Sequence, residues 1–362
     1  MHVRKKIDKV RQTIIWSLTK NVGLAPDDPG ERISPPEIKK ILISRPNHRL
    51  GNTLLITPLL QEVIDTFPQA QIDLFVKGKA ASVLLRNYDN INRIIQLPGK
   101  PFKNLFRYLK GWITLRRQRY DLAINAAYHS SSGRLSTRFA RSRYRCFGDP
   151  DEHTRSNRKD HEHAAKYPVY SLRSYLSMRG FPENKKPIAP LNLRLSASEI
   201  AGGRKLLNTL VADDKRTICL FTYATGEKCY SRSWWDEFYQ RLTTGHSNYN
   251  IIEVLPVENI SQLSFAIPAF YSRDVREIGS VIANTELFIG ADSGMMHLAS
   301  SVQTNTVGLF KITNPATFGP YNNKSVSIDT NTGNLDDWIK VIDNILVGSG
   351  LKDALQQQTD FS

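Results

Sequence analysis

The segment Ile289–Ser300, with the sequence IGADSGMMHLAS, is the strongest motif in the chain. A short apolar strand comes first, a turn of small and polar residues follows, and then a helix opens. Asp292 and Ser293 occupy helix N-cap positions, where free backbone N–H groups form an anion site. Gly294 permits close approach of the backbone to a ligand, and His297 reaches the same space. The segment predicts a βα unit with a phosphate-binding turn; the alternative is an ordinary capped turn with a packed histidine.

Alternating strands and helices extend from this segment in both directions. The short apolar runs that we expect to be strands are residues 41–43, 72–76, 93–97 and 121–125, and then 217–222, 251–255, 287–289 and 306–310. Helical stretches, which include those expected at about residues 53–67, 101–118 and 335–347, complete βαβ units with parallel sheets. The alternation of strands and helices begins again after Pro182–Pro190. The sequence therefore predicts two similar α/β domains joined by a linker, with the active site in the cleft between them.

The domain boundaries follow changes in composition. We expect a basic arm and linker over residues 1–38, an N-terminal domain over 39–186, a C-terminal domain over 187–347 and a tail over 348–362. Within the arm, residues 1–20 combine helical apolar spacing with basic side chains. That pattern is typical of a helix lying on a membrane surface or of one packed on the body of the protein.

The net charge is unevenly divided along the 362 residues. Of the total of +15, residues 1–190 contribute +19, with 35 lysines and arginines against 16 acids, and residues 191–362 contribute −4. Only the basic half is expected to face an anion-rich partner, such as nucleic acid, an anionic membrane or a phosphorylated substrate. Hydrophobic residues at 40% and charged residues at 23% exclude a wholly disordered or fibrous chain.

Further protein classes are excluded by simpler features. No apolar run approaches the roughly 18–20 residues of a membrane-spanning helix, and no secretory signal is predicted. Cys146, Cys219 and Cys229 contain no CxxC pair, which fits a reducing cytosol and argues against a disulfide framework. His161 and His163 lack a further ligand at metal spacing, so we expect no metal site.

Two other loops follow predicted strands of the second half. In Thr222–Trp235, Thr225 is placed to approach a phosphate and Lys228 to supply a positive charge to a diphosphate, although the Walker spacing is absent. A surface loop with one lysine is the alternative. Glu258 follows the strand at 251–255, where an acid can accept hydrogen bonds from ribose hydroxyls.

Three motifs, in this order, resemble glycosyltransferase family 9, the heptosyltransferases that build the lipopolysaccharide inner core. The family opens with a strand, a stretch like Arg-x-x-x-Leu-Gly-Asp and a helix containing Thr-Pro, and this chain has RPNHRLGN over Arg45–Asn52 and then Thr57-Pro58. Lys228–Trp235 is similar to a Lys- and Trp-containing element of the family. Asp292–Ala299 resembles Asp-Ser/Thr-Gly-x-x-His-Leu-Ala, and the resemblance covers roughly residues 39–347.

The resemblance implies a GT-B architecture, in which two Rossmann-like domains with parallel sheets face a central cleft. The N-terminal domain would bind an anionic lipid-linked glycan as acceptor, and the C-terminal domain a nucleotide-sugar donor, usually ADP-heptose, without an obligatory metal. By match, the donor residues would be Lys228 and Thr225 at the diphosphate, Glu258 at the ribose or base, and Asp292, Ser293, Gly294 and His297 along the phosphate and sugar.

Transfer would be inverting: an acceptor hydroxyl attacks the anomeric carbon, and the nucleoside diphosphate leaves. The chain departs from the family at Asn52, where members have an Asp that is thought to be the general base. An amide cannot accept the proton at neutral pH. We therefore consider His48, His129 and Asp121 as the base; alternatively, Asn52 only positions the acceptor, or the protein has little activity.

The resemblance offers an explanation for the positive charge of the N-terminal domain. Residues 100–145 carry 12 lysines and arginines and one acid, which suits a phosphorylated glycan and the anionic inner leaflet. The expected acceptor-binding residues are Arg45, Arg49, Arg134 and His161. We expect a cytoplasmic protein held peripherally at the inner face of the bacterial inner membrane. The alternatives are another nucleotide-sugar donor or a non-catalytic glycan-binding member; nucleic-acid binding rests only on the charge and is not expected.

Overall fold

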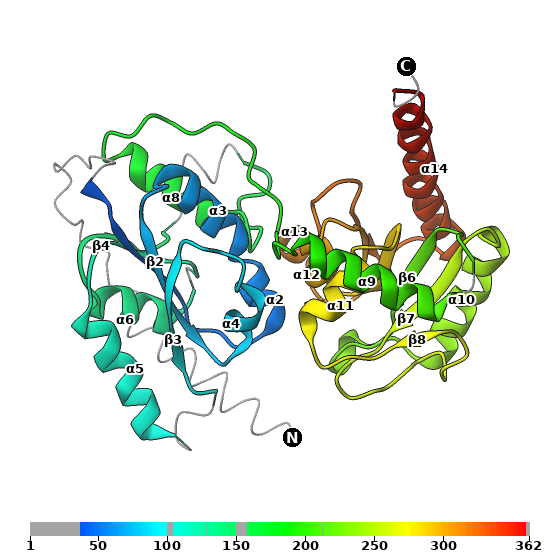
Figure 1. The fold of residues 1–362 in the computed structure, drawn as a ribbon, viewed down its shortest axis with the longest axis horizontal. Coiled ribbons are helices and arrows are strands. Elements are labelled where there is room, and N and C mark those ends of the chain that lie inside the picture. Colours follow the sequence, from blue (N-terminus) through cyan, green and yellow to red (C-terminus); the bar gives the residue numbers. More distant parts are fainter. Residues whose placement is uncertain (1–36, 100–103, 128, 150–157, 212, 360–362) are drawn as a thin grey trace. The chain divides into compact units, whose positions relative to one another are not determined.

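The computed structural model describes residues 37–99, 104–127, 129–149, 158–211 and 213–359. Residues 1–36, which include the expected amphipathic arm, lie outside the described residues, and so does the expected start of one helix at 101–103. The chain divides into two compact units, Met1–Ala189 and Pro190–Ser362, here called unit 1 and unit 2. Each is a parallel sheet with helices on both faces (Figure 1).

Unit 1 contains a five-stranded sheet in the order β3-β2-β1-β4-β5. Its strands are β1 (Lys40–Arg45), β2 (Gln71–Lys77), β3 (Ile91–Leu97), β4 (Arg119–Asn125) and β5 (Arg141–Cys146). Its helices are α2 (Leu50–Leu54), α3 (Thr57–Thr66), α4 (Ala80–Leu84), α5 (Leu105–Arg117), α6 (Ser131–Phe139) and α8 (Tyr167–Ser177). Helices α5 and α6 cover one face of the sheet, and α3 and α8 lie on the other.

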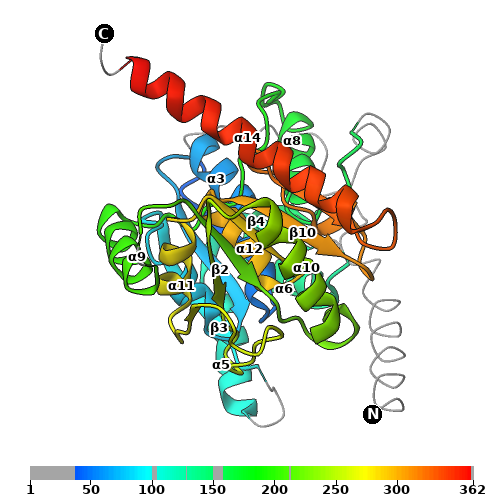
Figure 2. The same cartoon turned by 90° about the vertical axis from the view of Figure 1, so that its right-hand side faces the viewer.

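Unit 2 contains a six-stranded sheet in the order β11-β10-β9-β6-β7-β8. Its strands are β6 (Thr217–Phe221), β7 (Asn250–Val254), β8 (Ala269–Phe270), β9 (Leu287–Ala291), β10 (Asn305–Phe310) and β11 (Val326–Asp329). Its helices are α9 (Ala197–Leu210), the 3-10 turn η3 (Gly226–Lys228), α10 (Arg232–Gly245), α11 (Val275–Ile282), α12 (Gly294–Ser301), α13 (Pro315–Phe318) and α14 (Leu335–Thr359). Helix α14 begins beside α10, and its last turns extend beyond the sheet (Figure 2).

The strands form because their sequences are nearly continuous apolar runs. In β1, Ile41, Leu42 and Ile43 are fully buried, and all five residues of β6 and of β9 are buried. Parallel strands covered by helices on both faces need this composition, whereas a half-exposed strand would alternate with polar residues. The same runs therefore fix both the strands and the layers.

The sequence-based expectations and the structure differ at several places, and β8, α13 and β11 are among the elements that were not predicted. The helix expected from Thr53 to Phe67 is two helices, because Pro58 lacks an N–H group and starts α3 afresh. Helix α6 and strand β5 were not predicted, since RSRYRC in β5 is a polar edge strand without an apolar run. The last helix, expected to end near residue 347, continues to Thr359.

Both sheets have the strand order of a doubly wound fold, with the chain reversing direction across the sheet between two central neighbours. In unit 1 these neighbours are β1 and β4, and in unit 2 they are β6 and β9. Loops that leave the carboxyl ends of two such strands diverge to opposite faces, and the space between them is where ligands bind in these folds. None of the described helices is both long enough and apolar enough to cross a bilayer.

Candidate active site

The carboxyl ends of β6 and β9 bring together two of the predicted donor motifs. Residues 222–235 follow β6, and the turn at Asp292 follows β9, although the two segments are far apart in the chain. The Asp292 N–H donates to the carbonyl of Leu309 at 3.0 Å, which fixes the turn against β10. The sheet therefore holds the backbone of this site rigidly.

Asp292 is the central residue of the candidate site in unit 2. Its Oδ2 accepts hydrogen bonds from the Lys228 Nζ and from the hydroxyl of Thr313, which follows β10. Asp292 is buried, while one third of the Lys228 side chain is exposed. The buried carboxylate thus holds the ammonium group where it still reaches solvent, and an incoming anion can meet a positioned positive charge.

Helix α12 begins next to Asp292. Ser293 is its N-cap and accepts a hydrogen bond from the Met296 N–H at 3.4 Å. The N–H groups of Gly294 and the rest of the first turn have no carbonyl of their own helix to bind, so they present partial positive charge at the same end as Lys228. His297 lies in this helix and is buried. The arrangement suits a diphosphate, because a point charge and backbone donors converge.

The loop that carries Lys228 is fixed by a second cation. Lys311, at the end of β10, donates from Nζ to the Cys229 carbonyl at 2.8 Å and lies 4.7 Å from the centre of the Tyr230 ring. The Tyr230 hydroxyl is 2.8 Å from that of Thr330. Lys311 could not be predicted from the sequence, because its partners are about eighty residues away in the chain.

A buried acid network lies under the predicted ribose site. Glu253, in β7, accepts hydrogen bonds from the hydroxyls of Thr222 and Ser261. Burial raises the pKa of Glu253, and the two hydroxyl hydrogen bonds oppose that shift. The network ties the end of β6 to the loop carrying Glu258, which is itself exposed. An acid inside the apolar run NIIEV was the signal that could have identified it.

Thr225 lies at the start of this site as an exposed residue. It immediately precedes η3, at whose first residue, Gly226, φ is +68°. A positive φ is costly for a residue with a side chain, and glycine there lets the chain turn so that Lys228 points back to Asp292. Thr225 and Lys228 therefore lie on the same short turn.

The carboxyl end of β1 holds the matching loop of unit 1. Arg45 is buried, and its Nη1 donates to the carbonyl of Ala126, after β4, at 2.6 Å. Its Nη2 donates to the Asn52 Oδ1 at 3.1 Å. Burial lowers the pKa of Arg45, opposed by the neighbouring Tyr167. Asn52 lies inside helix α2 rather than in the expected turn, and its oxygen is already engaged by a cation.

His48 and Arg49 lie exposed in the same loop. The pKa of His48 is lowered, first by partial burial and then by the positive charges of Lys77 and Arg49. A side chain at Gly78 would bring its Cβ within 3.3 Å of the His48 Cβ, and Gly78 has φ of +78°. His48 is thus packed against glycine, and its imidazole stays neutral at neutral pH, as a proton acceptor must be.

Two predicted site residues lie elsewhere. Asp121 is at the amino end of β4, where its carboxylate accepts hydrogen bonds from the N–H groups of Lys39 and Lys40 at 2.8 Å. It is therefore at the opposite edge of the sheet from Asn52 and is wrongly placed for a base. Arg134 is fully buried and pairs with Asp149 at 2.6 Å, which anchors α6 and removes this arginine from the acceptor surface.

The last two predicted site histidines, His129 and His161, differ in their burial and contacts. His129 is exposed just after β4, at the same edge as Asn52. His161 is half-buried, with its Nδ1 at 2.7 Å from the Arg158 carbonyl and its Nε2 at 3.9 Å from Glu162. Among the described residues, no group of three or more His, Cys, Asp or Glu side chains is placed to hold a metal ion.

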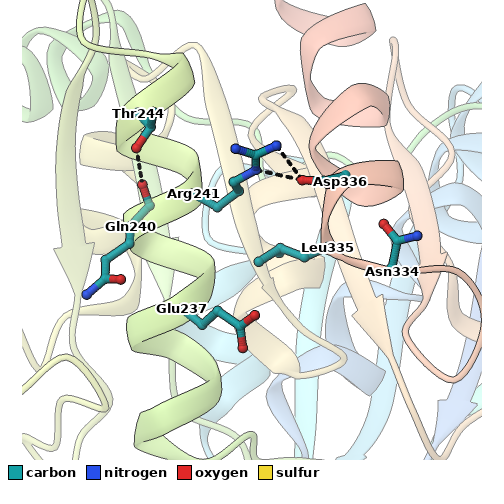
Figure 3. A pocket seen from close by; sticks show the side chains of 7 residues that line it. All are labelled: Glu237, Gln240, Arg241, Thr244, Asn334, Leu335 and Asp336. Carbon is teal, nitrogen blue, oxygen red and sulfur yellow. Dashed lines mark hydrogen bonds and ion pairs between the residues drawn. The ribbon is translucent and has the colours of Figure 1, made fainter.

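A pocket on unit 2 lies away from these residues (Figure 3). It is formed between α10 and the start of α14, and the Arg241 Nε donates to the Asp336 Oδ1 across it at 2.6 Å. The lining residues are Glu237, Gln240, Arg241, Thr244, Asn334, Leu335 and Asp336. Because none of the predicted site residues lines it, the pocket is separate from the candidate active site.

Comparisons with known proteins agree with this geometry. Residues 273–340, which include the Asp292 turn, match the sequence profile of glycosyltransferase family 9 (heptosyltransferase). No curated protein sequence matches the chain significantly.

Three solved structures share the fold. A glycosyl transferase of family 9 from Veillonella parvula has a TM-score of 0.65 at 17% identity, covering 86% of this chain and 97% of that one. The heptosyltransferase WaaC of E. coli, solved with ADP, has a TM-score of 0.61 at 16% identity, covering 84% and 99%. The ADP-heptose lipopolysaccharide heptosyltransferase II of E. coli has 0.62 at 16%, covering 86% and 100%. The two parallel-sheet units therefore share the GT-B fold of these structures, and the segment around the Asp292 turn is similar to glycosyltransferase family 9.

Proposed function

We propose that this protein transfers heptose from ADP-heptose to the core of lipopolysaccharide or to a related lipid-linked glycan, with inversion at the anomeric carbon. The observation that carries the proposal is the Lys228–Asp292–Thr313 cluster at the start of α12. The solved complex of WaaC with ADP-2-deoxy-2-fluoro heptose, which has a TM-score of 0.55 with this chain, supports the choice of donor.

Unit 2 would bind the donor and stabilise its leaving group. As the glycosidic bond to the diphosphate breaks, negative charge grows on the phosphate oxygens. Lys228 and the first-turn N–H groups after Ser293 would stabilise that charge without reorganisation, because Asp292 and the helix already fix them. Asp292 would act as a positioning residue, and Glu258 would reach the ribose or base.

Unit 1 would bind the acceptor and take up its proton. We assign the base to His48, because it is neutral and lies at the carboxyl edge of the sheet in the loop that also carries Asn52. The proton of the attacking hydroxyl passes to an imidazole nitrogen as its oxygen bonds to the anomeric carbon. Arg45 holds Asn52, which would orient the acceptor, and Arg49 and His161 would contact its anionic groups.

A thermal-shift series with ADP, UDP and GDP tests the donor class. A nucleotide at about 100 times its Kd adds about 2.7 kcal/mol to the free energy of unfolding. We expect ADP to stabilise the protein most and Lys228→Ala to abolish the effect. A clear preference for UDP or GDP would assign a different nucleotide-sugar.

A non-catalytic glycan-binding role is the second candidate. It is favoured by Asn52, whose amide stands where a carboxylate base is expected and is held by Arg45. Release of ADP from ADP-heptose on addition of lipopolysaccharide core acceptor would exclude this role. Donor binding with no release over many hours would support it.

The reaction would take place at the cytoplasmic face of the bacterial inner membrane, where a lipid-linked acceptor is held. The protein would then need a peripheral membrane contact.

A further inference from the structure

Helix α5 carries two separate apolar faces. Its inner face packs Trp112 and Leu115 against the core of unit 1, with the Trp112 ring 5.2 Å from that of Phe75. Gly111 lets the helix lie close to β3, because a Cβ there would be 2.6 Å from a methyl group of Leu97. The inner face therefore packs on the sheet and on the core of unit 1.

The outer face of α5 is apolar and exposed. Leu105, Phe106, Leu109 and Ile113 keep 57%, 82%, 51% and 50% of their surfaces in contact with solvent. At 3.6 residues per turn, these four positions fall within an arc of roughly 100° on the helix. Figure 1 shows α5 at the margin of unit 1, beside α6. Burying this arc would release a free energy that the folded unit alone does not gain.

The apolar surface continues onto α6. Leu135 and Phe139, one turn apart on that helix, are 44% and 39% exposed. The Phe139 ring packs edge-on against Trp112 at 5.5 Å, so the end of α6 is joined directly to α5. The two helices form one surface, here called the α5–α6 face, whose apolar members are Leu105, Phe106, Leu109, Ile113, Leu135 and Phe139.

Basic side chains surround this face. Arg107, Lys110 and Arg117 are exposed and lie next to the apolar arc of α5. Arg116 lies over the Phe139 ring at 5.4 Å and donates to its carbonyl at 2.9 Å, so its charge is fixed within the patch. The sequences of residues 104–120 and 129–145 contain no acid. The surface is thus apolar at its centre and positive at its rim.

We propose that the α5–α6 face binds the surface of an anionic lipid bilayer, with the apolar side chains in the interfacial layer and the basic rim on the lipid headgroups. Such a combination is the pattern of a helix that lies in a membrane interface. Lysines and arginines next to an anionic surface add to the apolar contribution. This proposal extends the lipid-linked acceptor proposed above, but it does not depend on the transfer reaction.

The charge of the α5–α6 face disfavours two other occupants, the chain's own N-terminal residues and a second copy of the chain. The chain's own N-terminal residues 1–20 carry six basic residues and one acid, so they would meet the basic rim with charge of the same sign. A second copy that paired through the same face would bring its own basic rim against this one. Only an anionic partner complements both the centre and the rim.

Vesicle flotation of the full chain tests the proposal. One set of vesicles contains phosphatidylglycerol and phosphatidylcholine, and the other contains phosphatidylcholine alone. We expect binding to the anionic vesicles that weakens as salt is raised, and little binding to the neutral ones. Sedimentation velocity without lipid is measured in parallel.

Two double variants address the two parts of the face. Phe106→Ser with Leu109→Ser removes apolar surface, and Lys110→Glu with Arg117→Glu reverses the charge of the rim. Each is expected to lower the vesicle partition coefficient about tenfold or more. The side chains are exposed, so thermal unfolding and ADP binding should be unchanged, which separates this test from the test of transfer.

Matched controls change equally exposed side chains outside the face. Val83→Ser with Met178→Ser removes apolar groups that are 41% and 67% exposed, and Lys159→Glu with Lys185→Glu reverses two exposed charges in the same unit. These controls should bind vesicles like the wild type. The proposal is overturned if the α5 variants also bind like the wild type, if neutral vesicles bind equally well, or if the α5 variants instead dissociate a dimer.

Discussion

The two sheets share a doubly wound strand order, but the loops at their carboxyl edges carry different charges. In unit 2, a buried acid, Asp292, holds Lys228, and the pair is balanced before any ligand arrives. In unit 1, the corresponding loop has Arg45 bound to the Asn52 amide and to the Ala126 carbonyl, and among the described residues no acid is paired with it. One strand order thus places a lysine beside a buried acid in unit 2 and, in unit 1, an arginine beside an amide and a backbone carbonyl.

The largest expected effect is at Lys228. Lys228→Ala should lower kcat/KM about a thousandfold, because it removes the charge that we propose for the leaving group and leaves Asp292 buried without its ion pair. Donor-dependent thermal stabilisation should vanish as well. Lys215→Ala, an exposed lysine paired with Asp213 at the far end of β6, is the control and should leave both unchanged. Near-normal kcat/KM in Lys228→Ala would remove unit 2 from the donor role.

The next effect concerns the base in unit 1. His48→Gln should lower kcat about a hundredfold with little change in the donor KM, because general-base catalysis is lost while the donor site is intact. His129→Gln, at the neighbouring strand end, is expected to change kcat much less. If the two variants exchange these results, His129 is the base and the assignment to His48 is wrong.

The pH profile gives a third and smaller effect. His48 must be neutral to accept a proton, and its pKa lies below the usual value of a histidine, so kcat should fall as the pH drops through that lowered pKa and be level above it. Lys77→Gln removes one of the positive charges that lower the pKa. The acid limb should therefore move to higher pH in this variant. If the profile does not move when Lys77 is changed, the fall in kcat at low pH does not report the titration of His48.

The smallest effect is expected at Asn52. A carboxylate at this position would face the buried Arg45 guanidinium, which lowers the pKa of a neighbouring acid and makes it a weak base. Asn52→Asp should therefore change kcat less than tenfold. A strong rise in kcat, measured under the same conditions as for His48→Gln, would instead show that the wild-type unit 1 lacks a base and would move that role from His48 to this position.

The local features of the candidate site in unit 2 could be predicted from the sequence, because they depend on neighbouring residues in the chain. Ser293 caps α12, and Lys228 and Asp292 each follow a buried strand, as their neighbours in the chain indicated. The predictions at Asp121 and Arg134 were wrong for a common reason. Composition does not tell which end of a strand a residue occupies, nor whether a charged helical residue faces solvent or an acid such as Asp149.

The two parallel sheets, the turn at Asp292 and the concentration of positive charge in the first half could be predicted from the sequence alone. These depend on patterns within a few residues or on totals that no fold can change. Only the tertiary structure decided the partners: Lys228 meets Asp292 across 64 residues, and Thr313 joins them from a third loop. Such pairs exist because the strand order brings distant strand ends together, and strand order depends on the packing of the whole unit.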